Sequence, residues 1–100
     1  MAFPIEKYKE EIEKICVQHS VVELDLFGSA TTEEFSDESD LDFIVDFEEE
    51  QKDLLGKFLS LKETLSEVLG RKIDLVCLDS IQNPYFKQSV EATKKNVFIS

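Results

Sequence analysis

Apolar and polar positions along this chain repeat with two different periods, and these periods predict its secondary structure. Apolar residues that recur every three or four positions mark amphipathic helices, whereas short runs rich in Val, Ile, Leu and Phe mark strands. The predicted elements are a helix over residues 4–18, a strand over 21–27, a short helical stretch after Gly28-Ser29, a strand over 41–47, a helix over 53–69, a strand over 72–78 and a helix that begins at Pro84. Residues 97–99 form either a terminal strand or a docking tail.

The alternation of helices and strands also predicts the fold class. We expect the 100 residues to form a single domain, 1–100, because no repeat, linker or change in composition divides the chain. This order of elements is typical of an α/β or α+β fold, with one small sheet flanked by helices. The periodicity leaves the order of the strands in that sheet open.

The charge balance bears on the partners that this chain can bind. It has 22 acidic and 11 basic residues, which give a formal net charge of -11. A surface this negative repels phosphate backbones, so we expect no nucleic-acid substrate. A basic protein would complement the charge better, and exposed apolar positions near Phe98 and Ile99 could form the drier centre of its interface.

Cysteine spacing and hydropathy predict the compartment. Cys16 and Cys77 lie far apart within apolar patterns, and no C-x-x-C spacing points to a zinc site, so we expect buried thiols outside any disulfide. No segment is apolar and long enough to span a membrane. The first residues lack the basic region and apolar core of a signal peptide, which favours a cytoplasmic protein.

A Gly-Ser pair stands where the strand over residues 21–27 gives way to a helical stretch. A glycine at such a junction lets backbone approach a phosphate closely, and the amides that follow can donate to anionic oxygens. Gly28 and Ser29 are therefore candidate nucleotide-binding residues. The alternative is an ordinary turn in which Ser29 caps a helix.

Three aspartates are candidate metal ligands. Asp40 and Asp42 lie two apart at the start of a strand, so their carboxylates point the same way and repel unless a cation lies between them. Magnesium prefers such oxygen ligands. Asp74 lies between Ile73 and Leu75 in another strand, where a shared metal would supply the partner that a carboxylate needs. The alternatives are a solvated strand face for the first two aspartates and a solvent-exposed sheet edge for Asp74.

Together these features resemble the minimal nucleotidyltransferases of the DNA polymerase β superfamily. The signature of that family is Gly-Ser, ten residues and Asp-x-Asp, and the matching string here is FGSATTEEFSDESDLDFIV. Asp74 follows on a later strand, as the third carboxylate of the family does. The resemblance covers nearly the whole chain and implies a polymerase β-like nucleotidyltransferase fold with a small mixed sheet.

The resemblance also implies a reaction. Gly28 and Ser29 would hold ATP or another nucleoside triphosphate, and Asp40, Asp42 and Asp74 would be the catalytic residues and the ligands of two magnesium ions. Stand-alone domains of this size resemble antitoxins that pair with a small helical HEPN-type ribonuclease toxin, and some of them attach AMP to a toxin tyrosine. The implied function is therefore magnesium-dependent transfer of AMP to a hydroxyl of such a partner.

One stretch departs from the family pattern. Family members commonly continue with Ala-Arg-Gly where this chain has Thr31, Thr32 and Glu33. The loss of a cation predicts transfer that is slow or depends on the partner. Two alternatives therefore stay open: a non-catalytic antitoxin-like module that masks a basic helical partner, and an aminoglycoside-type nucleotidyltransferase, for which 100 residues leave little room.

Overall fold

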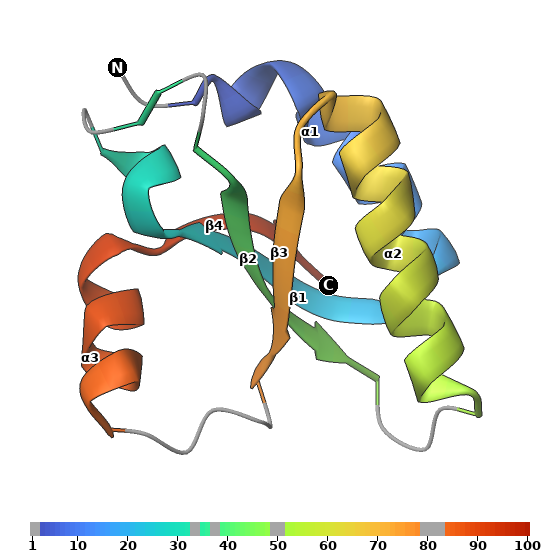
Figure 1. The fold of residues 1–100 in the computed structure, drawn as a ribbon. Helices are drawn as coiled ribbons and strands as arrows, with labels where there is room; N and C mark the ends of the chain where they lie inside the picture. Colours follow the sequence, from blue (N-terminus) through green and yellow to red (C-terminus); the bar gives the residue numbers. More distant parts are fainter. Residues whose placement is uncertain (1–2, 33–34, 37–38, 49–51, 79–83) are drawn as a thin grey trace.

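The helices and strands follow the predicted order. The computed structural model describes residues 3–32, 35–36, 39–48, 52–78 and 84–100. Its elements are a 3₁₀ turn η1 (Ile5–Tyr8), α1 (Lys9–Gln18), β1 (Val21–Phe27), a 3₁₀ turn η2 (Gly28–Thr31), β2 (Leu41–Phe47), α2 (Leu54–Leu69), β3 (Ile73–Cys77), α3 (Pro84–Thr93) and β4 (Lys95–Ile99) (Figure 1). The last apolar run is thus part of a strand.

The four strands form one mixed sheet in the order β3-β2-β1-β4. β1 pairs antiparallel with both β2 and β4, whereas β2 and β3 run parallel and are joined through α2. A parallel pair needs such a crossover, because the chain must return to the same end of the sheet before the second strand starts. The small mixed sheet flanked by helices that the sequence predicts is confirmed.

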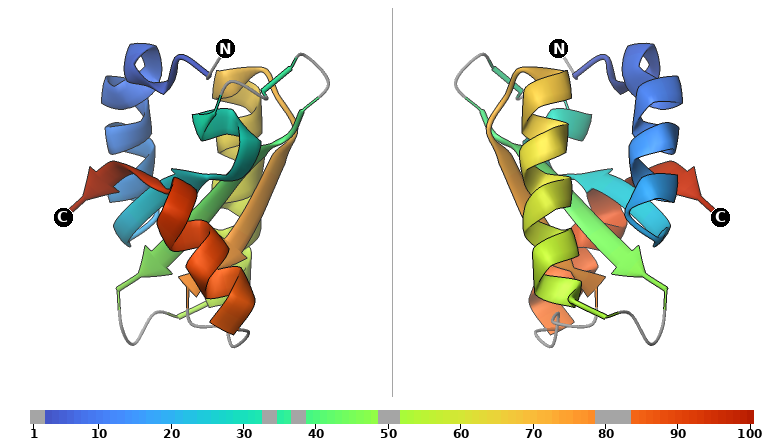
Figure 2. Two further views of the ribbon diagram at one scale, coloured as in Figure 1. Left: turned by 90° about the vertical axis from the view of Figure 1, so that its left-hand side faces the viewer. Right: turned by 90° about the vertical axis from the view of Figure 1, so that its right-hand side faces the viewer.

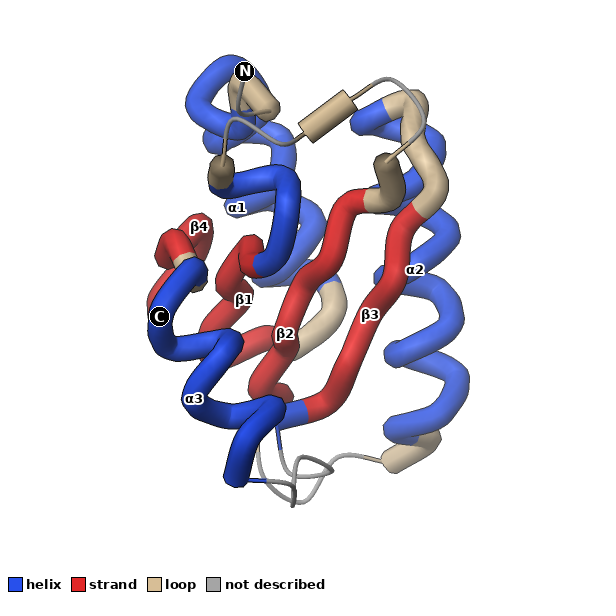
Figure 3. Tube along the Cα trace, turned by 60° about the vertical axis from the view of Figure 1, so that its left-hand side comes forward, coloured by secondary structure: helices blue, strands red, loops and turns tan. Residues whose placement is uncertain are grey.

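The helices cover the two faces of the sheet unequally. Helices α1 and α2 pack on one face, and α3 lies on the other, as Figure 2 and Figure 3 show. The larger core, on the first face, combines strand residues such as Leu24, Phe43 and Ile73 with helix residues such as Ile12 and Leu65. The face under α3 has a much smaller apolar cluster. Polar side chains therefore have room on that face.

Two differences from the sequence prediction concern helix ends. The expected helix over residues 4–18 is divided, because Tyr8 has φ -110° and ψ 5°, outside the helical region, and only the part after it is α-helical. Helix α2 begins at Leu54, one residue later than predicted, because Asp53 caps it: the Asp53 carboxylate accepts a hydrogen bond from the Gly56 amide. The helix ends before Gly70, which has φ 64°. Asn83, the predicted cap of α3, lies outside the described residues.

The two cysteines differ in burial, and only one of them agrees with the prediction. Cys16 and Cys77 form no disulfide. Cys16 is buried, and burial raises the pKa of its thiol to about 12, whereas Cys77 is only half-buried, so the expectation of a buried thiol is wrong there. None of the helices that the structure describes is long and apolar enough to cross a membrane.

Candidate active site

The chain leaves β1 through a Gly-Ser turn whose first residue has a conformation that favours glycine. Gly28 has φ +75°, a left-handed backbone conformation that side chains disfavour. A Cβ atom at this position would lie 2.6 Å from Oδ2 of Asp42, well inside van der Waals contact. The backbone angle therefore favours glycine, and any side chain at this position would also displace the carboxylate of Asp42. The turn thus brings bare backbone directly against a carboxylate of the next strand.

Hydroxyl groups hold this turn in place. Thr31 Oγ1 donates to the Gly28 carbonyl and Thr32 Oγ1 donates to the Ser29 carbonyl, each at 3.0 Å. The Gly28 amide donates to Oγ1 of Thr93 at 3.1 Å, which ties the turn to the end of α3. Thr93 was not predicted from the sequence, because no local pattern signals a contact across 65 residues. Glu33, the third residue of the departing stretch, lies outside the described residues.

Two of the three predicted aspartates lie in one row across the sheet. In the strand register, Phe27 is paired with Asp42, and Asp42 is paired with Asp74. Because Gly28 follows Phe27, the Gly-Ser turn lies at the same end of the sheet as Asp42 and Asp74. Asp40 comes just before β2 begins and is exposed. The fold thus gathers residues from positions 28, 40, 42 and 74 at one end.

The charges of Asp40 and Asp74 act on the carboxyl of Asp42. The pKa of Asp42, which is half-buried, is raised above its ordinary value of 3.8, first by burial and then by the negative charges of Asp74 and Asp40. Burial and like charge both disfavour an ionised carboxylate. When a carboxyl has a raised pKa in the folded state, the protein loses stability as pH rises from the ordinary pKa through the raised one. The site is therefore electrostatically strained at neutral pH.

Replacing Asp42 with asparagine is expected to stabilise the metal-free protein at neutral pH, by a few degrees in melting temperature. The gain should shrink as pH falls and disappear well below 3.8, where the wild-type carboxyl is protonated in both the folded and the unfolded states. Thermal unfolding across this pH range measures it. If repulsion between carboxylates causes the stabilisation, Asp42→Asn should raise the melting temperature less when Asp74 is also replaced by asparagine. A destabilised Asp42→Asn protein would contradict the electrostatic account and indicate a structural role.

The donor set fits a divalent cation. Carboxylate oxygens are the ligands that magnesium prefers, and three of them repel one another here. Within the residues that the structure describes, no three His, Cys, Asp or Glu side chains are grouped so that they could hold an ion as they stand. Asp40 and Asp74 are both exposed, so their side chains can turn towards Asp42 without disturbing the core.

Asp42 and Asp74 differ in how far solvent surrounds them. The face of β2 that carries Asp42 is not simply solvated, since Ile44 on the same face is buried in a cluster with Val90 of α3. The alternative for Asp74 describes its position in the sheet, because β3 is an edge strand and Asp74 is exposed. That position does not remove Asp74 from the site, because its charge acts on Asp42.

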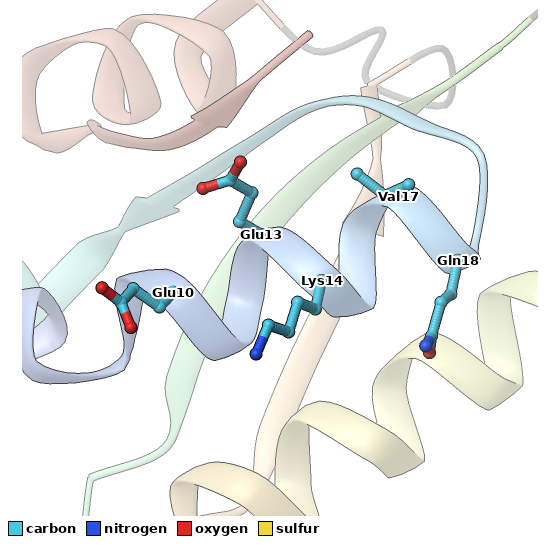
Figure 4. A pocket seen from close by; sticks show the side chains of 5 residues that line it. All are labelled: Glu10, Glu13, Lys14, Val17 and Gln18. Carbon is cyan, nitrogen blue, oxygen red and sulfur yellow. The ribbon is translucent and has the colours of Figure 1, made fainter.

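A surface hollow lies away from the aspartates and the Gly-Ser turn. It lies along the outer side of α1, where Figure 4 shows its lining residues: Glu10, Glu13, Lys14, Val17 and Gln18. None of them belongs to the Gly-Ser turn or to the aspartate row. The carboxylates and the turn, rather than this hollow, are therefore the candidate active site.

Comparison with known proteins agrees with this geometry. The family model "Polymerase beta, Nucleotidyltransferase" matches residues 10–100. Protein adenylyltransferase MntA of Thermococcus cleftensis is 39% identical over 82 residues, covering 74% of this chain and 81% of that protein. A solved structure, provisionally assigned as a minimal nucleotidyltransferase, superposes with a TM-score of 0.75 at 28% identity, covering 91% of this chain and 90% of the other. A chain of a toxin–antitoxin crystal structure with AMP-PNP has a TM-score of 0.71 at 22% identity over 92% of this chain and 73% of its own length, a likeness of fold alone.

Proposed function

The chain belongs to the polymerase β nucleotidyltransferase family, and from that membership we propose that it transfers AMP from ATP to a hydroxyl of a partner protein. The observation that carries the proposal is the row of Asp42 and Asp74 beside the Gly28 turn. Backbone amides of a glycine turn can bind the phosphates of ATP, and nearby carboxylates can bind the magnesium ion that accompanies them.

The proposed reaction assigns a role to each residue. Gly28 and Ser29 receive the triphosphate, and Asp40 and Asp42 hold its magnesium. The acceptor oxygen attacks the α-phosphorus of ATP, the bond from that phosphorus to the bridging oxygen breaks, and pyrophosphate leaves. Asp74 takes the proton from the acceptor hydroxyl as that oxygen attacks. Its exposure at a sheet edge supports this role, since a bulky protein acceptor can reach an edge strand.

Magnesium fits the site because the carboxylates of Asp40, Asp42 and Asp74 are mutually repelling oxygen donors. When bound, two such ions supply charge balance for the triphosphate and lower the pKa of the attacking hydroxyl. ATP as the donor also places the proposed reaction in the cytoplasm, with which two cysteines outside any disulfide are consistent.

The proposed partner is a small, basic, helical protein of the HEPN toxin type, which makes this chain an antitoxin. The net charge of -11 favours a positively charged surface and a salt-sensitive association rate. Ile99, at the end of an edge strand, is 66% exposed and can supply an apolar contact, whereas Phe98 is half-buried against the core. The fold is also that of a chain in a toxin–antitoxin complex, which supports the pairing.

The second candidate function is masking of the same partner without chemistry. It is favoured by Thr32, an uncharged residue that occupies the place where family members commonly carry arginine and whose hydroxyl donates to the Ser29 carbonyl. Without a positively charged side chain at this place, the negative charge of the triphosphate is less well neutralised, and electrostatic stabilisation is a large part of catalysis. We therefore propose weak transfer by the chain alone and efficient transfer in the complex.

Intact mass separates the two functions. The chain is incubated with ATP and magnesium, with and without the protein encoded by the neighbouring reading frame, and both chains are then weighed. We expect an AMP-sized gain on the partner that disappears with Asp40→Ala and without magnesium. A complex that forms and inhibits the partner but gives no adduct with any nucleoside triphosphate would assign the chain to the masking function.

A further inference from the structure

The only arginine of the chain lies beside the segment that leads into Asp40. Arg71 follows Gly70, the residue that ends α2, and its backbone carbonyl accepts a hydrogen bond from Ser66 Oγ at 2.8 Å. Its position is therefore fixed by the end of a sixteen-residue helix. From there its side chain reaches across to the segment between η2 and β2.

The guanidinium of Arg71 makes three contacts with that segment. Nη2 donates to the carbonyl oxygen of Ser36 at 2.7 Å and to that of Ser39 at 2.6 Å. The guanidinium carbon lies 4.6 Å from the centre of the Phe35 ring, in cation–π geometry. Charge-assisted hydrogen bonds of this kind are stronger than neutral ones, and the flat guanidinium presents its donors in a fixed arrangement.

The Ser39 carbonyl is joined to the Asp40 amide in one planar peptide group. A hydrogen bond that fixes this carbonyl also fixes the backbone nitrogen of Asp40. We propose that Arg71 is a positioning residue for nucleotidyl transfer, which sets the direction of the Asp40 carboxylate by holding the Ser39–Asp40 peptide. This inference rests on the proposed function, in which Asp40 helps to hold magnesium.

Further contacts show why one arginine can have this effect. Within the segment, the Ser39 amide donates to the Ser36 carbonyl at 3.0 Å. The Phe35 ring lies edge-on to Phe3 with centroids 5.6 Å apart, and the Phe3 amide donates to the Ala30 carbonyl of η2 at 2.9 Å. The Arg71 side chain thus completes a series of contacts that runs from η2, through Phe3 and Phe35, to the residue before Asp40.

The test compares Arg71→Met, which keeps much of the side-chain volume, with Arg71→Lys and with Lys72→Met. Lys72→Met removes one positive charge from the neighbouring residue, whose side chain is exposed. The probe is a non-hydrolysable ATP analogue, and the measurement is the magnesium concentration that gives half-maximal binding. We expect a shift of about tenfold or more for Arg71→Met, a smaller one for Arg71→Lys and none for Lys72→Met, since removal of a group that orients a metal ligand costs about 10- to 100-fold in affinity.

A second readout, in the protein without metal or nucleotide, separates this inference from the proposed function. We expect the amides of Ser39 and Leu41 to exchange hydrogen faster in Arg71→Met but not in Lys72→Met. If wild-type protein shows no magnesium-dependent binding, the proposed function fails, and the exchange rates alone decide whether Arg71 holds the peptide. Unchanged exchange and unchanged magnesium dependence in a folded Arg71→Met protein would overturn the inference, as would equal losses in Lys72→Met.

Discussion

Gly28→Ala is expected to weaken magnesium-dependent nucleotide binding about 100-fold, because displacement of a positioned group by about 1 Å can have an effect of that size. The new Cβ would lie 2.6 Å from Asp42 Oδ2, so the Asp42 carboxylate must turn away from the turn. The added methyl also occupies the space that backbone leaves for a phosphate. Titration of a non-hydrolysable ATP analogue in magnesium measures the loss, and Gly28→Val should abolish binding in a domain that still folds.

Gly70 offers a matched control for this substitution. It has φ +64°, close to the +75° of Gly28, but no atom of a residue other than its chain neighbours lies within 4 Å of the position that a Cβ would take. Gly70→Ala and Gly28→Ala should therefore suffer a similar backbone penalty of about 1–2 kcal/mol in the free energy of unfolding. Only the change at position 28 should reduce nucleotide affinity. Equal affinity in folded Gly28→Ala and Gly70→Ala proteins would remove the Gly-Ser turn from the nucleotide site.

Strand positions and the Gly-Ser turn could be predicted because their causes are local. The bounds of β1 and β2 agree with the predicted 21–27 and 41–47, since each strand is a short apolar run bordered by residues that end strands. Alternation along β2 correctly assigns Phe43 to the core and Asp42 to the opposite face. Gly28 was also predicted for a local reason, backbone approach, although the observed neighbour is Asp42.

The order of the strands and the supports of the site could not be predicted in the same way. Strand pairing joins residues that are far apart in the sequence, so periodicity leaves open that β3 lies beside β2 rather than beside β1. The hydrogen bonds of Thr93 with Gly28 and of Arg71 with Ser39 also join residues that are far apart in the sequence. Each joins an ordinary-looking residue of one element to a loop that becomes its neighbour only after folding.

These unpredicted contacts have a common consequence for the candidate site. Its carboxylates repel one another, and Asp42 is ionised only at a cost that burial increases. Local hydrogen bonds in a short turn would not by themselves keep such groups together. Thr93 and Arg71 anchor the loops on either side to α3 and to the end of α2, which are held by the packed core. The fold thus maintains an arrangement that a bound cation would stabilise.

The last prediction concerns Asp74 and separates catalysis from masking. Asp74→Asn is expected to slow AMP transfer to the partner by about 10²- to 10⁴-fold, the usual contribution of a general base. Nucleotide affinity should change much less, because Asp40 and Asp42 remain to hold the magnesium. The assay follows partner mass against time in single-turnover reactions, with nucleotide binding titrated separately.

Asp46→Asn is the control, because Asp46 lies on the same face of β2 as Asp42 but is paired with Glu23 at the opposite end of the strand. This variant removes the same charge from the same sheet face without touching the turn or the row, so its transfer rate should stay near that of the wild type. Equal rates for Asp74→Asn and wild type would exclude Asp74 as the base. Equal losses in Asp74→Asn and Asp46→Asn would instead attribute the effect to overall charge, as expected if the acidic face mainly attracts a basic partner.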